Sequence, residues 1–316
     1  MVASTVERTT PLAAAQSCFR VMGCAAQVMI TGGTGAQLES AEARLRELES
    51  RWSRFVADSD ITRANRAAGT PVAVHTDTLV VVERAVDAWK QTRGRFDITV
   101  LPALVHHGYR HSASGPATAL APRVSEQIIG VSGDIVVDES NGTLTVPAGA
   151  AIDLGGIGKG FAADLVVGEL IESGVRGALV NIGGDIAARG FAAPGDAPWE
   201  IGVEDPLEAP ALICTVRFVE GAVATSGTTV RQWTTPSGAT AHHLIDPTTA
   251  RPATTSLLTA SVIASDAATA EAFATAAMMA DGPTAVELLE RAGLAGMAIT
   301  RDGRTHCTES WAAFAC

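Results

Sequence analysis

The chain has 316 residues, of which 47% are hydrophobic, enough for one large core or two modest domains. Its formal net charge is -11, and aromatic residues make up only 4%. The basic surface and the stacking aromatics of nucleic-acid-binding proteins are therefore missing, and we expect no nucleic acid partner.

The N-terminal segment is polar and rich in small residues, so we expect a disordered tail over 1–17, followed by a single domain over 18–316. Charges stand where the apolar run of a secretory signal would lie, and no apolar run approaches the roughly 18 residues of a membrane span. A cytoplasmic protein is expected. The five cysteines are scattered without CxxC spacing, which favours reduced thiols over disulfides or a zinc site.

In the N-terminal half, alternating residues predict a strand over 19–30, and helices are predicted over 36–53 and 76–92. The stretch 106–125 is the longest irregular segment. Asn141-Gly142 between two apolar runs is the strongest short-range hairpin signal in the chain. The first helix is indicated by apolar residues spaced three and four apart: Leu38, Ala41, Leu45, Leu48, Trp52 and Phe55.

The C-terminal half is richer in strands. An apolar strand is expected to end at Asp153, with a helix beginning near Lys159, and residues 178–190 predict a strand bent back at a glycine pair. Further short strands are expected over 199–203, 212–219, 222–226, 242–246 and 257–264. Helices are expected over 266–281, with Ser265 as the N-cap, and over 283–292, with Pro283 at the first position. The sum predicts an α+β fold with a mostly antiparallel sheet and packed helices.

The stretch DLGGIGKGFAAD, residues 153–164, has the appearance of a phosphate-binding loop. A Walker A loop requires Ser or Thr after Gly158-Lys159, where this chain has Gly160. A dinucleotide fingerprint requires a third glycine at the position of Phe161. Both familiar motifs therefore fail, and two readings stay open: a phosphate at a helix start, or a tight turn whose glycines only allow close packing.

Eight ordered blocks stand out in the chain: MGC (22–24), WSRFVADSDITRANRAAG (52–69), GRFDITVLPAL (94–104), DLGGIGKGFAAD, LVNIGGDIAARG (179–190), VATSGTTVRQW (223–233), HHLIDPTTARPA (242–253) and ASDAATAEAFATAAMMA (264–280). Together they resemble the FAD:protein FMN transferases, the ApbE family. The resemblance implies a T-fold-like α+β domain and an enzyme that binds FAD and uses magnesium to break its pyrophosphate. FMN would pass to a Thr or Ser of an acceptor protein, and AMP would be released.

The resemblance also implies residues that bind FAD. Core packing is the alternative for Met22, Phe55 and Phe96. Asp97 either caps a turn or receives a ligand's N–H or hydroxyl, and Lys159 either neutralises phosphate or is a solvated lysine. The residues implied for the flavin nucleotide are Met22, Phe55, Gly155, Phe161 and Ile245, with Lys159 beside the phosphates, and those implied for the adenosine part are Arg95, Phe96 and Asp97.

The magnesium ligands implied by the resemblance are the carbonyl oxygen of Gly158 and the side chains of Glu271 and Thr275. Glu271 and Thr275 are four residues apart, so both project from one helical face, and their oxygens are the hard ligands that magnesium prefers. The family usually has Asp at the position of Glu271. This departure puts the affinity for the metal in doubt, and Asp266 is assigned to the helix start.

His243 and Asp246 are the candidate catalytic pair, because a neutral histidine can take the proton of a threonine hydroxyl if an acid orients it. Asp246-Pro247 also fits a turn start, and Asp246 is alternatively a direct base. Asn181 and Asp185 are interpreted as turn and hydrogen-bonding residues rather than catalytic ones. Two smaller groups complete the reading: Thr225, Ser226 and Gly227 are expected at the floor of the site, and His106, His107 and His111 are expected at the surface.

The acceptor expected for this family carries an SGAT-type segment, and residues 237–240 of this chain read Ser-Gly-Ala-Thr. Modification of Thr240 itself is therefore one hypothesis, although Pro236-Ser237-Gly238 is also an ordinary turn sequence. Two alternatives to transfer are hydrolysis of the FAD pyrophosphate and non-catalytic carriage of FAD. The sequence indicates neither the identity of the acceptor nor the oligomeric state.

Overall fold

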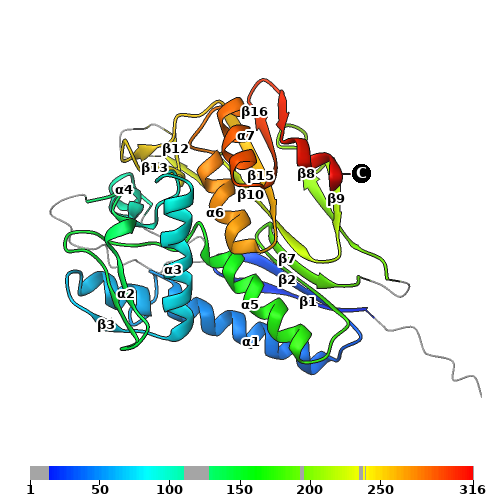
Figure 1. Ribbon diagram of the computed structural model, residues 1–316, viewed down its shortest axis with the longest axis horizontal. Helices are drawn as coiled ribbons and strands as arrows, with labels where there is room; N and C mark the ends of the chain where they lie inside the picture. The colour runs from blue at the N-terminus through cyan, green and yellow to red at the C-terminus, as the bar shows by residue number, and fades with distance from the viewer. Residues whose placement is uncertain (1–13, 110–127, 193–195, 235–237, 239, 316) are drawn as a thin grey trace, which may run out of the picture.

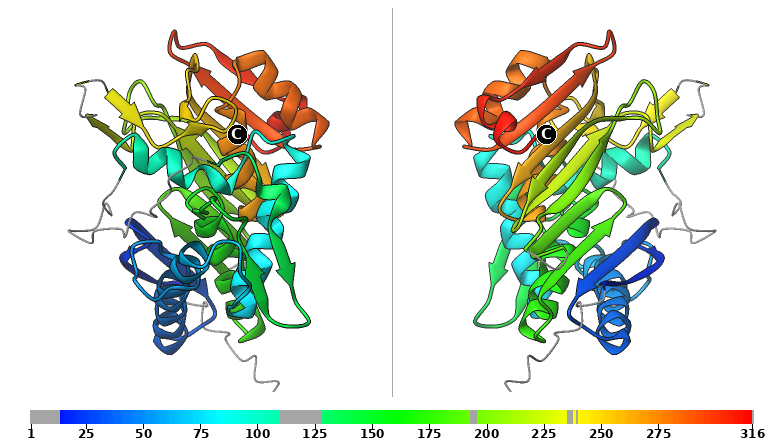
Figure 2. Two further views of the ribbon diagram at one scale, coloured as in Figure 1. Left: turned by 90° about the vertical axis from the view of Figure 1, so that its left-hand side faces the viewer. Right: turned by 90° about the vertical axis from the view of Figure 1, so that its right-hand side faces the viewer.

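The fold is built around one large antiparallel sheet in the computed structural model, which describes residues 14–109, 128–192, 196–234, 238 and 240–315. The sheet has eight strands (Figure 1). Figure 2 shows the blue N-terminal hairpin at one end of the molecule and the orange-red C-terminal strands at the other. Along the sheet the order is β1 (Ala14–Val21), β2 (Cys24–Thr31), β6 (Gly177–Ile182), β7 (Asp185–Gly190), β10 (Gly221–Gly227), β15 (Leu257–Ala264), β16 (Ala295–Thr300) and β17 (Thr305–Cys307). Every neighbouring pair is antiparallel.

Helices cover one face of this sheet. The helices predicted over 36–53 and 76–92 are confirmed as α1 and α3, because their apolar residues fall on one buried side. The helices are α1 (Gly35–Trp52), α2 (Asp60–Arg66), α3 (Thr76–Gln91), α4 (Leu101–His106), α5 (Gly158–Glu172), α6 (Ala267–Ala277) and α7 (Gly282–Arg291), and the short 3-10 helices are η1 (Ile98–Val100), η2 (Ser132–Asp134) and η3 (Glu309–Ala313).

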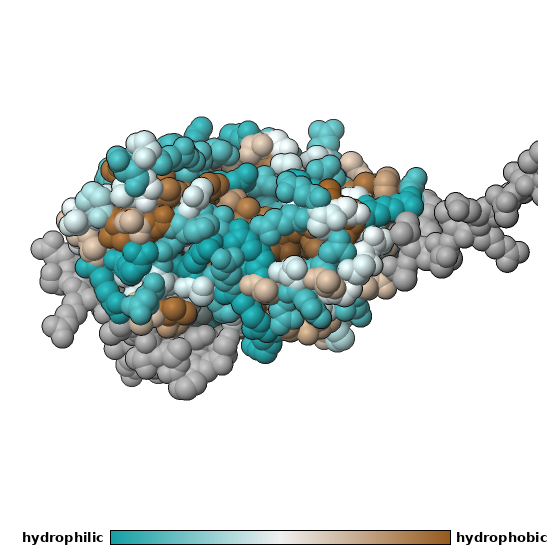
Figure 3. Space-filling view, turned by 90° about the horizontal axis from the view of Figure 1, so that it is seen from below, coloured by the Kyte–Doolittle hydropathy of each residue, from teal (hydrophilic) through white to brown (hydrophobic). Residues whose placement is uncertain are grey.

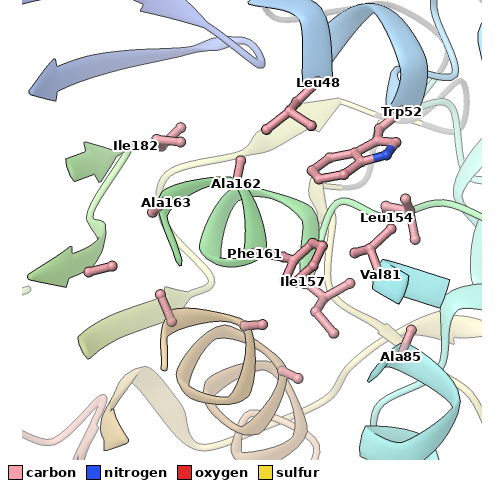
Figure 4. Packing of buried hydrophobic residues seen from close by; sticks show 14 of the residues in the cluster. Leu48, Trp52, Val81, Ala85, Leu154, Ile157, Phe161, Ala162, Ala163 and Ile182 are labelled. Atoms are coloured by element: carbon pink, nitrogen blue, oxygen red, sulfur yellow. The ribbon is translucent and has the colours of Figure 1, made fainter. Parts of the chain in front are cut away.

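The largest core cluster lies between the sheet and the helices α1, α3, α5 and α6. Figure 4 shows Leu48 and Trp52 of α1 facing Ala162 and Phe161 of α5, with Ile182 of the sheet beside them. A second cluster fills the opposite face, where residues of η3 and of the hairpin formed by β8 (Trp199–Glu204) and β9 (Leu212–Phe218) pack against the sheet. Apolar side chains are therefore buried on both faces of the sheet, and the α+β prediction is confirmed.

Short strand pairs surround the main sheet. The hairpin predicted at Asn141-Gly142 is confirmed, since Gly142 adopts a φ of 65° in the turn, a backbone conformation that favours glycine. The predicted bend at the glycine pair is also confirmed, as the turn between β6 and β7. The remaining strands are β3 (Val72–Ala73), β5 (Thr143–Thr145) and β4 (Val136–Asp138) in one small sheet, β11 (Gln232–Thr234) with β12 (Thr240–His242), and β13 (Ile245–Asp246) with β14 (Arg251–Pro252).

The N-terminal region differs from the prediction in two ways. Residues 14–17, expected to belong to a tail, are part of β1, because their backbone pairs with β2; residues 1–13 lie outside the described part of the chain. The single strand expected over 19–30 is instead a hairpin. Its turn is formed by Met22, with a φ of 51°, and Gly23, with a φ of 74°. The division into one domain stays a prediction.

The strand expected to end at Asp153 is absent from the described residues. The backbone N–H and C=O of Ile152 bond to the side chain of Asn65, and the N–H of Asp153 bonds to the carbonyl of Ile98. The strand expected over 242–246 is also interrupted, since β12 ends at His242 and β13 begins at Ile245. His243 therefore lies in an irregular connection between two strands. Its side chain does not have to follow the alternating directions of side chains along a strand.

The surface seen in Figure 3, on the side where α1 lies, is mainly hydrophilic, with apolar residues in separate patches. Part of this polarity comes from α1, where Arg44 pairs with Glu47 and Glu169, and Arg46 pairs with Glu42. Over the residues that the structure describes, every helix is too short or too polar to cross a membrane.

Candidate active site

A cleft of about 250 Å³ opens beside Glu271 and Thr275 of α6, where the ends of several helices and strands meet. Its volume approaches the roughly 300–1,000 Å³ of small-molecule sites. It is bordered by the loop after α1, the segment after α3, the glycine loop before α5 and the turn between β6 and β7. Two implied site residues, Phe161 and Asp246, do not line it. The implied residues that do line it are Met22, Phe55, Arg95, Phe96, Asp97, Gly155, Gly158, Lys159, His243, Ile245, Glu271 and Thr275.

Phe161 belongs to the core. Its ring is stacked on that of Trp52 at a centroid distance of 5.8 Å, and Figure 4 shows it beside Ile157. Only 4% of the residue is exposed. The side chain therefore anchors the first turn of α5 under the cleft, which corrects the expectation that it contacts a flavin nucleotide.

Asp153, the first residue of the glycine loop, connects the loop backbone to Arg54. One carboxylate oxygen accepts a hydrogen bond from the N–H of Gly155 at 2.6 Å, and the other pairs with Nε of Arg54 at 2.6 Å. A β-carbon on Gly156 would lie 3.1 Å from the ring of Phe96. Gly156 thus permits close packing, while the helix begins at Gly158, as predicted.

The start of α5 lies directly against the start of α6. A β-carbon on Gly160 would be 2.2 Å from the carbonyl oxygen of Ala267, so only glycine fits there. The last acid of the stretch, Asp164, accepts hydrogen bonds from the N–H groups of Ala267 at 2.7 Å and Ala268 at 2.9 Å. Burial raises the pKa of Asp164 to about 6. The stretch therefore fixes α6 relative to α5.

The N-cap of α6 is Asp266, which corrects the assignment of Ser265. The carboxylate of Asp266 accepts hydrogen bonds from the N–H of Thr269 at 2.9 Å and from its hydroxyl, a pairing that a serine one residue earlier does not reach. The helix is also shorter than expected, because the chain tightens after Ala277, where the N–H of Ala280 bonds to its carbonyl.

Lys159 stands at the centre of a buried ion cluster. Its ammonium forms ion pairs with Asp185 of β7 and Glu271 of α6, and the second oxygen of Glu271 accepts a hydrogen bond from the N–H of Gly160 at 2.8 Å. Burial opposes the charged form of Lys159, but the two carboxylates outweigh it and raise the pKa. Burial also raises the pKa of Glu271. Lys159 is therefore not a solvated lysine, and Asp185 has the hydrogen-bonding role expected of it, with Lys159 as its partner.

The oxygen donors beside Lys159 fit a hard divalent cation. Glu271 and Thr275 lie one turn apart on α6, the hydroxyl of Thr275 is 3.2 Å from that of Ser226, and Gly158 lines the same part of the cleft. No group of three or more His, Cys, Asp or Glu side chains at metal-binding distance occurs in the described part of the chain. Any metal held here would therefore depend on Glu271 with hydroxyl, carbonyl and substrate oxygens, as magnesium sites commonly do.

His243 lines the cleft, but Asp246 does not orient it. The carboxylate of Asp246 accepts hydrogen bonds from the N–H and hydroxyl of Thr248, at 2.8 and 2.7 Å, so it forms the turn that was the alternative reading. Nδ1 of His243 is buried without a partner in the described residues. Burial and the positive charges of Arg231 and Lys159 lower the pKa of His243 to about 3. The ring is therefore neutral at physiological pH.

Asp97 has one satisfied and one unsatisfied oxygen. Oδ1 accepts hydrogen bonds from the N–H and hydroxyl of Thr99 and from the hydroxyl of Ser132. Oδ2 is buried and has no partner among the described residues, although Asp97 lines the cleft. Burial raises the pKa of Asp97 against these hydrogen bonds. One oxygen fixes a turn, as the first reading expects, and the other has no protein partner in the described residues, while its contact with a ligand stays a prediction.

Arg54, Phe55 and Tyr109 line one side of the cleft together. The guanidinium of Arg54 lies 4.2 Å from the ring centroid of Phe55 and 5.0 Å from that of Tyr109. Tyr109 in turn stacks on Trp233 at 5.2 Å. Tyr109 could not be predicted from the sequence, because its partners Arg54, Phe55 and Trp233 are distant along the chain.

Arg231 is a second residue that the sequence did not single out. It is half-buried in the cleft, and its guanidinium donates a hydrogen bond to the sulfur of Cys24 at 3.0 Å. No carboxylate in the described part of the chain forms an ion pair with it. A half-buried guanidinium without an acidic partner is suited to an anionic ligand.

The remaining expectations concern residues away from the cleft. His106 is exposed, and the Nε2 atom of His107 hydrogen-bonds to the carbonyl of Ala250 at 3.0 Å, while His111 lies outside the described residues. Of the Ser-Gly-Ala-Thr segment, only Gly238 and Thr240 are described, and Thr240 is exposed on β12.

Comparisons with known proteins point to a single family. A family model described as the ApbE family matches residues 22–298. The FAD:protein FMN transferase of Treponema pallidum is 31% identical, with 76% of this chain and 70% of that protein aligned, and that of Haemophilus influenzae is 27% identical, with 90% and 84% aligned. Among solved structures, the ApbE protein from Thermotoga maritima superimposes with a TM-score of 0.84 at 25% identity, covering 96% of this chain and 99% of that one. The apo form of the Pseudomonas stutzeri flavinyl transferase ApbE gives 0.79 at 24% identity, covering 96% and 98%.

Proposed function

The chain belongs to the ApbE family, and on that premise we propose that it is an FAD:protein FMN transferase that moves FMN from FAD to a Thr or Ser hydroxyl of an acceptor protein. One observation carries the proposal: a free carboxylate oxygen on Asp97, an unpaired guanidinium on Arg231 and the cluster around Lys159 line a single cleft. These groups match a hydrogen-bond donor, a diphosphate and its counter-cation, which are the parts of a metal-bound dinucleotide.

FAD would be held along the length of the cleft. Oδ2 of Asp97 would accept a hydrogen bond from the adenosine part, whose N–H and hydroxyl groups are donors, with Arg95 and Phe96 beside it. Phe55 and Met22 would contact the flavin nucleotide together with Gly155 and Ile245. Tyr109 meets the ring of Phe55 edge-on, and aromatic side chains of this kind pack favourably against a ring ligand.

Magnesium would be held by Glu271, Thr275 and the carbonyl oxygen of Gly158. When bound, it would neutralise phosphate charge and polarise the diphosphate. Arg231 supplies a fixed positive charge on the same side of the cleft, which favours a dianionic ligand even before the metal arrives.

His243 would receive the acceptor's proton. The hydroxyl oxygen attacks the phosphorus of the FMN half, the bond from that phosphorus to the bridging oxygen breaks, and AMP leaves with that oxygen. A histidine with a pKa near 3 is a weak base, but the negative charge of a bound diphosphate raises that pKa toward neutrality. Asp246 has no part in this step.

An incubation with FAD and magnesium tests the proposal, with and without a peptide that contains Ser-Gly-Ala-Thr. The transferase releases AMP and increases the peptide mass by one FMN unit. Release of AMP without labelled peptide would identify a pyrophosphate hydrolase. Bound FAD with no AMP in either sample would identify a carrier.

A further inference from the structure

We propose that Lys159 acts as an internal counter-cation which bridges the carboxylates of Asp185 and Glu271 and must move away from Glu271 before a divalent cation binds to Glu271, Thr275 and the carbonyl oxygen of Gly158. The inference rests on the proposed function for the identity of the metal site. It assigns to the free protein a closed state, in which the site carries its own cation.

Lys159 lies buried between the two carboxylates. The ammonium contacts Asp185 and Glu271 at once, and the exposed fractions of the three side chains are 13% for Lys159, 5% for Asp185 and 3% for Glu271. The other oxygen of Glu271 is engaged by the N–H of Gly160. Both oxygens of Glu271 are therefore engaged in the free protein, and a metal that approaches the oxygen beside Lys159 meets the positive charge of the ammonium.

The ammonium of Lys159 also changes the net charge that the cluster presents to a metal ion. Two carboxylates and one ammonium leave a net charge of about -1 at this position, whereas the pair alone would present -2 to an incoming cation. A divalent cation and an ammonium compete for the same oxygens, so each weakens the binding of the other. The cluster thus lowers the affinity of the free protein for metal.

Position 159 is a lysine in a chain whose basic residues are almost all arginine. The chain has 23 Lys and Arg residues but only two lysines, Lys90 and Lys159. A guanidinium is planar and broad, while an ammonium is a compact point charge that fits between two carboxylates, as a metal ion does. Lysine at position 159 is therefore suited to standing in for a metal, in a chain that otherwise uses arginine.

Nucleotide binding gives Lys159 another partner. A diphosphate drawn to Arg231 enters the cleft that Lys159 also lines, so the ammonium can turn from the carboxylates to phosphate oxygens. Metal and nucleotide then bind with positive coupling, each strengthening the other by the same factor. This order protects the free protein from an unproductive metal.

Manganese binding without nucleotide tests the inference, with free Mn²⁺ followed by its EPR signal. We expect Lys159→Gln to bind Mn²⁺ more tightly than the wild type by on the order of tenfold. Lys90→Gln is the matched control, because Lys90 is an exposed lysine paired with Asp87 on α3, and it should bind as the wild type does. Equal or weaker binding by Lys159→Gln, with its fold verified by circular dichroism, would overturn the inference.

A second measurement uses the unmodified protein. Lysine labelled with ¹³C at Cε gives two resonances, one for each lysine. Saturation with Mg²⁺ should shift the Lys159 signal and leave that of Lys90 in place, and a metal-bound protein with both signals unmoved contradicts the displacement. The AMP assay judges the proposed function separately, since it reports turnover of FAD and these two experiments contain no FAD.

Discussion

Gly160 of α5 lies against Ala267 of α6 so closely that a β-carbon on Gly160 would be 2.2 Å from the carbonyl oxygen of Ala267. The obstructing atom is backbone, so no change of side-chain rotamer can relieve the clash. The contact also sets the position of the Gly160 N–H, which donates to Glu271.

Gly160→Ala should destabilise the protein by about 3 kcal/mol or more, because the two helices must separate to admit the methyl group. The matched control is Gly168→Ala in the same helix, where no atom lies within 4 Å of the added carbon. That variant should gain roughly 0.5–1 kcal/mol. Urea unfolding of both variants measures the difference, and equal midpoints would refute the close contact.

Glu271→Ala should abolish magnesium-dependent release of AMP from FAD, because it removes the carboxylate assigned to the metal. Glu287→Ala, an exposed acid on α7, serves as the control and should retain full turnover. Turnover in both proteins is followed by chromatography of AMP. Undiminished release by Glu271→Ala would remove this residue from the site.

Asp97→Asn should weaken FAD binding by about tenfold or more, since the amide places donor hydrogens where Oδ2 would accept a hydrogen bond from the ligand. Stability should change little if the remaining oxygen keeps the three donors of Oδ1. Calorimetric titration with FAD in the absence of metal measures the affinity. Asp134→Asn, an exposed neighbour, is expected to bind normally, and wild-type affinity in Asp97→Asn would exclude the proposed contact.

Arg231→Gln should raise the KM for FAD more than it lowers kcat, because the guanidinium would attract the diphosphate before any bond changes. The exposed Arg251 on β14 provides the control variant. Initial rates over a range of FAD concentrations separate the two constants. A fall in kcat alone would argue for a role in the chemical step.

The stability of the protein should fall on acidification, in part through His243. Its folded pKa of about 3 lies below the value near 6.5 expected for the unfolded chain, so the unfolded state takes up the proton first. This stabilisation is therefore fully present above pH 6.5 and is lost progressively toward pH 3. The free energy of unfolding should be lower by roughly 1–2 kcal/mol at pH 5 than at pH 7.5.

Urea unfolding between pH 4.5 and 7.5 measures this contribution. His243→Gln should show a flatter dependence of the unfolding free energy on pH than the wild type. His106→Gln, which changes an exposed histidine, should keep the wild-type slope. Parallel curves for all three proteins would show that His243 is not buried in its neutral form.

The sequence predicted local elements well where periodicity or turn chemistry decides the structure. The apolar spacing of Leu38 to Trp52 marks α1 because that helix packs one face on the sheet, and Gly142 marks a turn because of its φ. The strand expected before Asp153 failed because an apolar run is also compatible with an irregular segment, here held by the side chain of Asn65. Local pattern cannot report such a distant partner.

The resemblance predicts which residues belong to the candidate site, but it does not predict which charged side chains pair with one another. Asp185 follows two glycines and reads as a turn residue, although its carboxylate reaches Lys159 across 26 positions of sequence. Asp246 was expected to orient His243, but its carboxylate instead accepts a hydrogen bond from Thr248. In both cases the direction of one side chain decided the role, and that direction is set by tertiary packing.

The alanine-rich helix α6 has a thermodynamic consequence. Alanine has no rotamers to lose, so ordering this buried helix carries little side-chain entropy loss, and its backbone packs closely on its neighbours. Glu271 is its single charged residue, held on a backbone with few alternative packings. The freedom that remains in the site therefore resides in the side chains of Glu271 and Lys159, and the helix acts as a fixed frame against which they rearrange.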